Sequence, residues 1–137
     1  MKPDQVIDAL KSALEAIPQV QLALLFGSFA QGKSSQGSDI DLGIAYKEKM
    51  SLDERIDLAQ GLSRILKREV DVVDLRTADG VLLQQVLNHR KTLVRRDQVL
   101  LGNLISKRVV EESDFMPLLD MILKSRRERV IRGTKNN

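Results

Sequence analysis

The chain has 137 residues, the size of one domain, and this length is sufficient to bury a real hydrophobic core. Its apolar content of 42% and charged content of 30% are typical of a soluble globular protein, and no apolar run is long enough to cross a bilayer, so we expect a cytoplasmic protein. The net charge is +3, and the absence of cysteine excludes disulfides and thiolate metal sites, so any metal must be held by oxygen atoms or by the single histidine, His89.

The first part of the chain predicts a helix, a buried strand and a short second helix. Apolar residues recur at helical spacing over residues 6–17, and Pro18 ends the pattern. Residues 22–26 (LALLF) are a continuous apolar run of strand length, bounded by a glycine. Because apolar and polar residues do not alternate in this run, we expect both faces of the strand to be covered. A short helix is expected from residue 28 to about residue 32.

A second strand follows a loop of serine, glutamine and glycine at residues 33–38. In residues 39–44 (DIDLGI), isoleucine and leucine alternate with aspartate and glycine, which predicts one apolar face and one face that carries carboxylates. Beyond it, Ser51 and Glu54 form a capping box that opens a helix, whose apolar stripe continues to Leu66.

The remaining elements complete a small α/β domain. Residues 68–75 (REVDVVDL) predict a third strand, and Thr77 or Asp79 is expected to cap the next helix. Residues 91–96 (KTLVRR) are consistent with a short edge strand. This order of elements predicts an α/β (α+β) fold with a small mixed sheet flanked by helices. We expect a core domain over residues 1–97 and a helical C-terminal extension over residues 98–137.

The extension ends in a strongly basic segment. Residues 124–137 carry six basic side chains and one acid, a charge of +5, which leaves −2 for the rest of the chain. The extension, with its apolar stripe from Phe115 to Leu123, can pack on its own domain, on a partner or on both, and the basic residues can simply be a solvated helix face. Aromatic residues are 3% of the chain, so stacking platforms are scarce and we expect no direct nucleic-acid binding and no membrane partner.

Asp39 and Asp41 form the first candidate site. Side chains two residues apart on a strand point to the same face, so these carboxylates lie a few ångströms apart and repel each other unless a cation lies between them. Hard oxygen ligands without cysteine or histidine suit Mg²⁺, which binds one or two carboxylates together with phosphate oxygens. A solvated pair on an exposed strand is the alternative interpretation.

A third carboxylate is available from the strand at residues 68–75. Asp71 and Asp74 are three residues apart, so only one of them can face the side on which Asp39 and Asp41 lie. We choose Asp71, in the interior of the strand, because Asp74 is near its end and suits a cap or loop role. Three acids around two Mg²⁺ ions can activate an attacking hydroxyl and stabilise a pyrophosphate leaving group.

Gly27 and Ser28 supply a candidate phosphate site behind the first strand. Glycine leaves room for a ligand, serine offers a hydroxyl donor, and the amides that open the next helix point outward with the positive end of its dipole. A Gly-Ser pair alone is more often an ordinary turn. Its position directly before the aspartate pair makes it informative.

These motifs together resemble a known family. The segment GSFAQGKSSQGSDIDL with the later VDVVDL is similar to the G-S-x-A-x-G and S-D-x-D-L pattern of the polymerase β-like nucleotidyltransferases, over about residues 22–96. The whole chain, including VDLRTADGVLLQQVL, most resembles the MntA antitoxins of HEPN/MNT toxin–antitoxin pairs. The resemblance implies a mixed-sheet fold, Mg²⁺, ATP as donor, and transfer of AMP to a tyrosine of the cognate HEPN ribonuclease toxin, which silences it.

The resemblance also implies residue roles. Asp39, Asp41 and Asp71 would be catalytic and hold the metal ions, two of them, with Asp71 as a ligand or as base toward the acceptor hydroxyl. The nucleotide-binding residues would be Gly27, Ser28, Gln31, Lys33 and Ser38. Many relatives have arginine where this chain has Gln31, so a charged phosphate contact is missing here or is replaced by Lys33.

Two alternatives remain from the sequence. The chain could modify a small molecule of the aminoglycoside type, although about forty residues after residue 96 leave little room for the second domain that such enzymes use. It could also be a non-catalytic antitoxin that acts by binding alone, against which the intact pair of aspartates argues.

Overall fold

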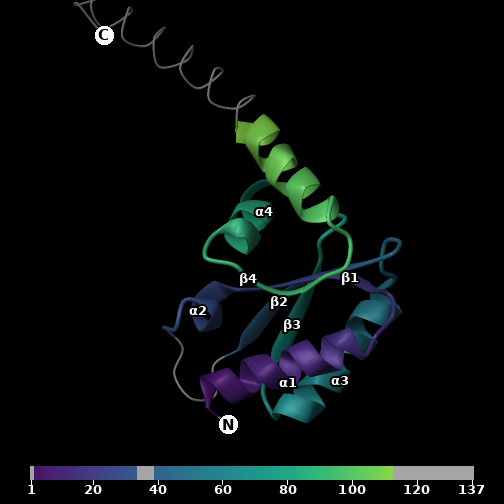
Figure 1. Cartoon of the computed structure of the whole chain (residues 1–137), viewed down its shortest axis with the longest axis vertical. Helices are drawn as coiled ribbons and strands as arrows, with labels where there is room; N and C mark the ends of the chain where they lie inside the picture. The colour runs from purple at the N-terminus through teal and green to yellow at the C-terminus, as the bar shows by residue number, and fades with distance from the viewer. Residues whose placement is uncertain (1, 34–38, 113–137) are drawn as a thin grey trace, which may run out of the picture.

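The computed structural model describes residues 2–33 and 39–112. Its helices and strands alternate along the chain (Figure 1): α1 (Pro3–Glu15), β1 (Val20–Phe26), α2 (Gly27–Ala30), β2 (Ile40–Tyr46), α3 (Leu52–Leu66), β3 (Val70–Asp74), α4 (Gly80–Leu87) and β4 (Lys91–Arg95). A further helix, here called the C-terminal helix, is described over residues 100–112. The basic segment predicted at residues 124–137, and the apolar stripe before it, lie outside the described residues.

The four strands form one mixed sheet in the order β3-β2-β1-β4. β1 pairs antiparallel with both β2 and β4, whereas β2 and β3 run parallel. The helix α3 supplies the crossover that a parallel pair requires. The predicted mixed sheet flanked by helices is therefore confirmed, and the edge position expected for residues 91–96 is that of β4.

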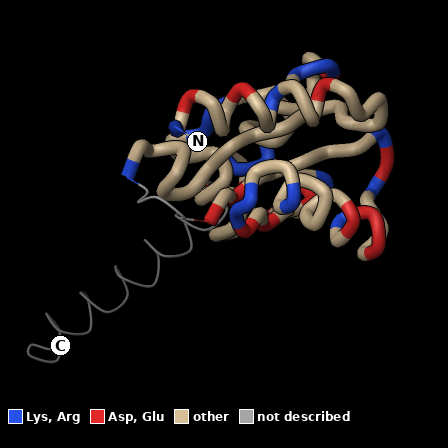
Figure 2. The backbone as a smooth tube through the Cα atoms, turned by 90° about the horizontal axis from the view of Figure 1, so that it is seen from below, with Lys and Arg blue, Asp and Glu red and all other residues tan. Residues whose placement is uncertain are grey.

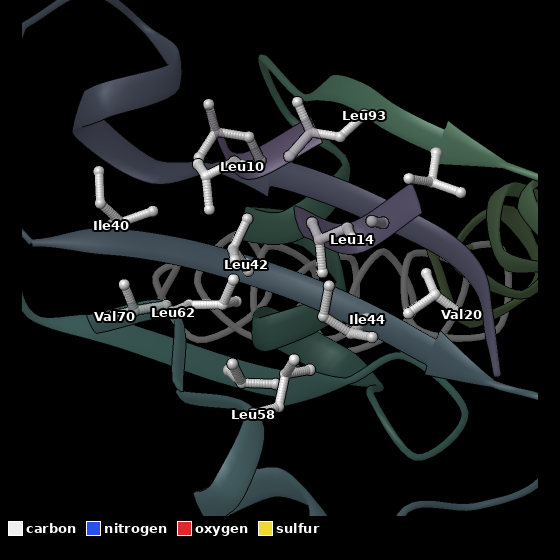
Figure 3. Packing of buried hydrophobic residues seen from close by; sticks show 14 of the residues in the cluster. Leu10, Leu14, Val20, Ile40, Leu42, Ile44, Leu58, Leu62, Val70 and Leu93 are labelled. Carbon is white, nitrogen blue, oxygen red and sulfur yellow. The ribbon is translucent and has the colours of Figure 1, made fainter. Parts of the chain in front are cut away.

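Each face of the sheet is covered by its own helical layer, α1 and α3 on one side and α4 with the C-terminal helix on the other (Figure 1). Leucines of α1 and α3 pack against isoleucine, leucine and valine side chains of β2 and β3 in the first core (Figure 3). The second core joins β1 to α4 and to Leu100, Leu101 and Leu104 of the C-terminal helix. The double cover explains why β1 is a continuous apolar run.

The sequence predicts that one face of β2 is apolar and that the other carries carboxylates, and the structure differs from this prediction on the second face. That face of β2 carries Asp41 only at the start of the strand, and the positions that follow on it, Gly43 and Ala45, are buried beneath α4 and the loop before it. A β-carbon at Gly43 would lie 2.6 Å from Leu75 Cδ2, so the glycine permits this close cover. Carboxylates therefore occupy one end of the face rather than its whole length.

The helix α3 begins as predicted. Ser51 Oγ accepts from the Glu54 amide at 3.1 Å, and Glu54 Oε1 accepts from the Ser51 amide at 2.9 Å, so both halves of the capping box are formed. Asp79 is the N-cap residue of α4, without a side-chain capping bond. Within the described ranges, none of the helices is long and apolar enough to cross a membrane.

Candidate active site

The turn between β1 and α2 is shaped by Gly27. Its φ of +76° is in the left-handed region, which glycine adopts without strain. A β-carbon at this position would lie 2.3 Å from Asp41 Oδ2, because Phe26 pairs directly with Asp41 across the antiparallel strands. Gly27 is therefore required twice, for the turn and for the space that the Asp41 carboxylate occupies.

The short helix α2 presents Ser28 to solvent beside this turn. Phe29 and Ala30 are buried, whereas Ser28 is exposed. The amides of this first turn have no preceding helical carbonyl to bond, so they remain available to an anion. The guanidinium of Arg68, which comes just before β3, lies 5.1 Å from the centre of the Phe29 ring and helps to fix α2 on the sheet.

Three aspartates gather next to this corner. Asp41 of β2 and Asp71 of β3 are direct partners in the parallel ladder, and Asp39 lies two residues before Asp41, immediately ahead of β2. Asp39 and Asp71 are exposed and Asp41 is half-buried. Along β2, Ile40, Leu42 and Ile44 point into the first core. Asp41, Gly43 and Ala45 alternate with them, so Asp41 faces the side covered by α4 and the C-terminal helix.

The electrostatics of the cluster converge on Asp41. Burial raises the pKa of the Asp41 carboxyl above its ordinary value, and the nearby negative charges of Asp71 and then Asp39 raise this pKa further. The carboxylate of Asp41 is thus held where its charge is disfavoured. A cation placed between these groups would remove the repulsion.

Asp74 is placed differently from Asp71. It is buried, and its two carboxylate oxygens accept hydrogen bonds from the amides of Met50 at 3.1 Å and Arg76 at 3.0 Å. It lies on the side of the first core, as expected for a residue three positions from Asp71 on a strand. Asp74 holds the chain after β2 and after β3, and it does not join the cluster.

The other expected nucleotide contacts are dispersed. Gln31 and Lys33 are exposed on the turn after α2, and among the described residues neither side chain bonds to the carboxylates. Ser38 lies outside the described residues. Arg68 was not singled out by the sequence reasoning, because its contact with Phe29 joins segments almost forty residues apart and no local pattern marks it.

Comparison with known proteins identifies the arrangement. The sequence profile of the family described as "Polymerase beta, Nucleotidyltransferase" matches residues 8–99, which include Gly27, Ser28 and all three clustered aspartates. The chain belongs to this nucleotidyltransferase family.

The similarity to several individual proteins extends over nearly the whole nucleotidyltransferase. It is 32% identical over 127 residues to "Protein adenylyltransferase MntA" of Shewanella oneidensis, covering 90% of this chain and 91% of that protein. A solved structure described as a toxin–antitoxin with AMP-PNP has 32% identity and a TM-score of 0.67, covering 90% of this chain and 99% of that one. Another, a tri-AMPylated Shewanella oneidensis HEPN toxin in complex with MNT antitoxin, has 28% identity and the same TM-score of 0.67, covering 89% and 99%.

Whether the clustered carboxylates suit a divalent cation can be judged from the ligand atoms that they offer. Over residues 2–33 and 39–112, no three acidic, histidine or cysteine side chains form a ready-made metal site. In proteins, Mg²⁺ is commonly bound by one or two carboxylates, and water and substrate phosphates complete its shell. Burial of the Asp41 carboxyl, and then the negative charges of Asp71 and Asp39, raise its pKa, so a cation between these groups would favour the ionised form and the residues fit a metal that enters with a nucleotide.

Proposed function

We propose that this nucleotidyltransferase is the antitoxin of a toxin–antitoxin pair, and that it transfers AMP from ATP to a tyrosine of a HEPN ribonuclease toxin and thereby silences it. The observation that carries the proposal is the whole-length similarity to a protein adenylyltransferase, 32% over nine-tenths of both chains. Structures of the same fold contain an ATP analogue in one case and an AMPylated HEPN toxin in another.

The reaction is a displacement at the α-phosphorus of ATP. The acceptor tyrosine oxygen forms a bond to this phosphorus, the bond from the α-phosphorus to the bridging oxygen breaks, and pyrophosphate leaves with that oxygen. The hydroxyl proton passes to Asp71 or to water. Gly27 and Ser28 would bind the triphosphate at the start of α2, where the amides of the first helical turn and the serine hydroxyl can donate to phosphate oxygens.

Asp39 and Asp41, with Asp71, would hold Mg²⁺, and we expect two ions. Bound Mg²⁺ supplies positive charge at the phosphates and lowers the pKa of the attacking hydroxyl. The chain's part is to present the carboxylates on paired strands, so that their spacing is set by the sheet rather than by a loop. Of the nucleotide contacts, Gln31, Lys33 and Ser38 remain proposals that rest on the family motif.

The test of the proposal is transfer of labelled AMP from ATP to the purified toxin. The double variant Asp39→Asn and Asp41→Asn should lose transfer by orders of magnitude, because neither amide replaces a carboxylate as a ligand for Mg²⁺. Asp53→Asn and Asp57→Asn on α3 form the matched control, since they remove the same charge from exposed positions on the other face. Circular dichroism checks that both variants are folded.

Two results would contradict the proposal in different ways. Undiminished labelling by the double aspartate variant would remove the catalytic role of the cluster. Full neutralisation of the toxin by a variant that no longer labels it would mean that the protein acts by binding alone.

A further inference from the structure

The short helix α2 depends on other parts of the chain for its position. It is a single turn, Gly27–Ala30, and a helix of this length is not stable by itself, because forming the first turn fixes several dihedral angles for one hydrogen bond. It packs on β1 and β2, and its Phe29 and Ala30 side chains are buried in the first core. The exposed Ser28 therefore keeps its place only as long as these two side chains keep theirs.

Arg68 reaches α2 from the segment before β3. Its guanidinium carbon lies 5.1 Å from the centre of the Phe29 ring, a distance at which the face of an aromatic ring attracts a cation. Both partners are shielded from water, since Phe29 is 4% exposed and Arg68 is half-buried. Contacts of this kind shift an equilibrium roughly 2-fold when they are exposed and roughly 30-fold when they are desolvated, so a partly shielded contact falls between these values.

Arg68 is also close to the clustered carboxylates along the chain. The carbonyl of the residue after Arg68 accepts from the Ile40 amide at 2.9 Å, which joins this segment to the start of β2. Two residues further, Asp71 is the ladder partner of Asp41. At this same end of the sheet, Phe26, the residue before α2, pairs with Asp41. The backbone of Arg68 is thus tied to the strands that carry the carboxylates, while its side chain contacts α2.

We infer that Arg68 is a positioning residue for the nucleotide, which acts through the Phe29 ring to hold Gly27 and Ser28 where they can meet the triphosphate. The inference rests on the proposed function, and it adds a residue that acts without touching the nucleotide. Without the guanidinium, α2 would be displaced in a fraction of the molecules, and the apparent affinity for the nucleotide would fall with the fraction that remains competent. In the bound complex α2 is in place, so the rate at saturation should change little.

The test compares Arg68→Met with Arg68→Lys and with the control Arg64→Met. Methionine keeps an unbranched apolar stem and loses the charge, whereas lysine keeps a cation that can lie over the ring. The control removes the same charge from an exposed position on α3. By calorimetry with Mg²⁺, Arg68→Met should bind AMP-PNP roughly fivefold or more weakly than the wild type, and the other two variants should stay within about twofold. In AMP transfer, the KM for ATP should rise by the same factor in Arg68→Met while kcat stays within about twofold.

A double-mutant cycle tests whether Arg68 acts through the ring. Phe29→Leu keeps a large apolar side chain in the first core and removes the aromatic face. In this background, Arg68→Met should reduce AMP-PNP affinity by less than about twofold, because the contact is already lost. Circular dichroism checks that the variants are folded. An equal loss in both backgrounds would mean that the guanidinium acts on the nucleotide by its charge, which would overturn the positioning role.

The remaining outcomes separate the inference from the proposed function. A wild type that binds no AMP-PNP would overturn both, and one that binds it but labels no toxin would count against the proposed function while the affinities still decide the role of Arg68. Wild-type binding with unchanged affinity in Arg68→Met, or an equal loss in Arg64→Met, would overturn the role of Arg68 alone. So would a fall in kcat with an unchanged KM, which would place the effect of Arg68 on the chemical step.

Discussion

At the scale of single residues, the site combines an unfavourable charge with a backbone that makes room for it. Asp41 is half-buried beside two other carboxylates, and Gly27 leaves the space in which its Oδ2 lies. The free protein therefore contains a group whose ionisation works against folding. Sites arranged for a bound cation commonly carry such a cost when the cation is absent.

The Asp41→Asn variant should unfold at a higher temperature than the wild type at pH 7, although it loses activity. Because the folded-state pKa of Asp41 is raised, the folded wild type holds its proton to higher pH, and stability falls as pH rises from the unfolded pKa through the folded one. Thermal unfolding from pH 3 to pH 8 should show the variant's advantage growing through this window and staying constant above it. A variant less stable than the wild type at pH 7 would mean that the Asp41 carboxylate is stabilised by its surroundings.

Asp71 and Asp74 should separate activity from stability. Asp74→Ala leaves the buried amide of Met50 and the partly buried amide of Arg76 without their acceptor, which should lower the free energy of unfolding by about 1–3 kcal/mol. Asp71→Ala removes an exposed carboxylate and should leave stability within about 0.5 kcal/mol, but reduce AMP transfer by orders of magnitude. Denaturant unfolding and labelled ATP measure the two effects, and the opposite pattern would exchange the roles of these residues.

At the scale of elements, the junction of β1 with α2 can be compared with the turn that ends α2. Gly27 and Gly32 both have positive φ, +76° and +71°. A β-carbon at Gly27 would collide with the Asp41 carboxylate, whereas one at Gly32 would meet nothing within 4 Å. Both glycines therefore need a positive φ, but only Gly27 also leaves space for a neighbouring side chain.

Gly27→Ala should reduce AMP transfer by at least tenfold, because Asp41 must move to admit the new methyl group. Gly32→Ala carries the same kind of backbone strain, about 1 kcal/mol, and should keep most of the activity. Transfer rates and unfolding free energies of both variants give the comparison. Equal losses of activity in both would show that the backbone conformation matters and the contact with Asp41 does not.

Much of the fold could be predicted from sequence because its signals are local. The capping box at Ser51 and the alternation around Asp41 depend on residues a few positions apart. The cover over Gly43 could not be predicted, since glycine and alanine do not indicate which side of a strand is buried, and Leu75 arrives from another element. The contact of Arg68 with Phe29 is likewise non-local.

At the scale of the whole molecule, the two helical layers have different relations to the site. The layer of α1 and α3 encloses the first core, and α4 with the C-terminal helix forms the layer on the other side of the sheet (Figure 1). By strand alternation, Asp41 and its ladder partner Asp71 face this second layer. Acidic and basic residues are interspersed over the described chain rather than collected on one element (Figure 2). The two helical layers thus differ in which face of the sheet they cover rather than in the charge that they carry.

The C-terminal helix should be part of the folding unit. Leu100, Leu101 and Leu104 each contribute about 1.5–3 kcal/mol by burial, roughly 5–9 kcal/mol together, which is comparable to the whole stability of a small domain. A chain ending at residue 97 should therefore unfold at low denaturant or fail to fold, whereas a chain ending at residue 112 should unfold cooperatively. If the shorter chain proved as stable as the longer one, residues 1–97 would be an independent domain.

The hydrogen bonds of Asp74 have a consequence for the alignment of the carboxylates. A slip of β3 by one residue against β2 would turn Val70 and Val72 outward and bury Asp71, which the first core opposes. A slip by two residues would keep the faces but carry Asp71 about 7 Å along the strand, away from Asp41. That slip would also pull Asp74 away from the amide of Met50, which lies beyond the end of β2. Asp74, which is buried and lies outside the aspartate cluster, thus opposes a displacement that would leave the faces of β3 unchanged. Substitutions selected for stability alone would therefore tend to keep Asp41 and Asp71 opposite each other.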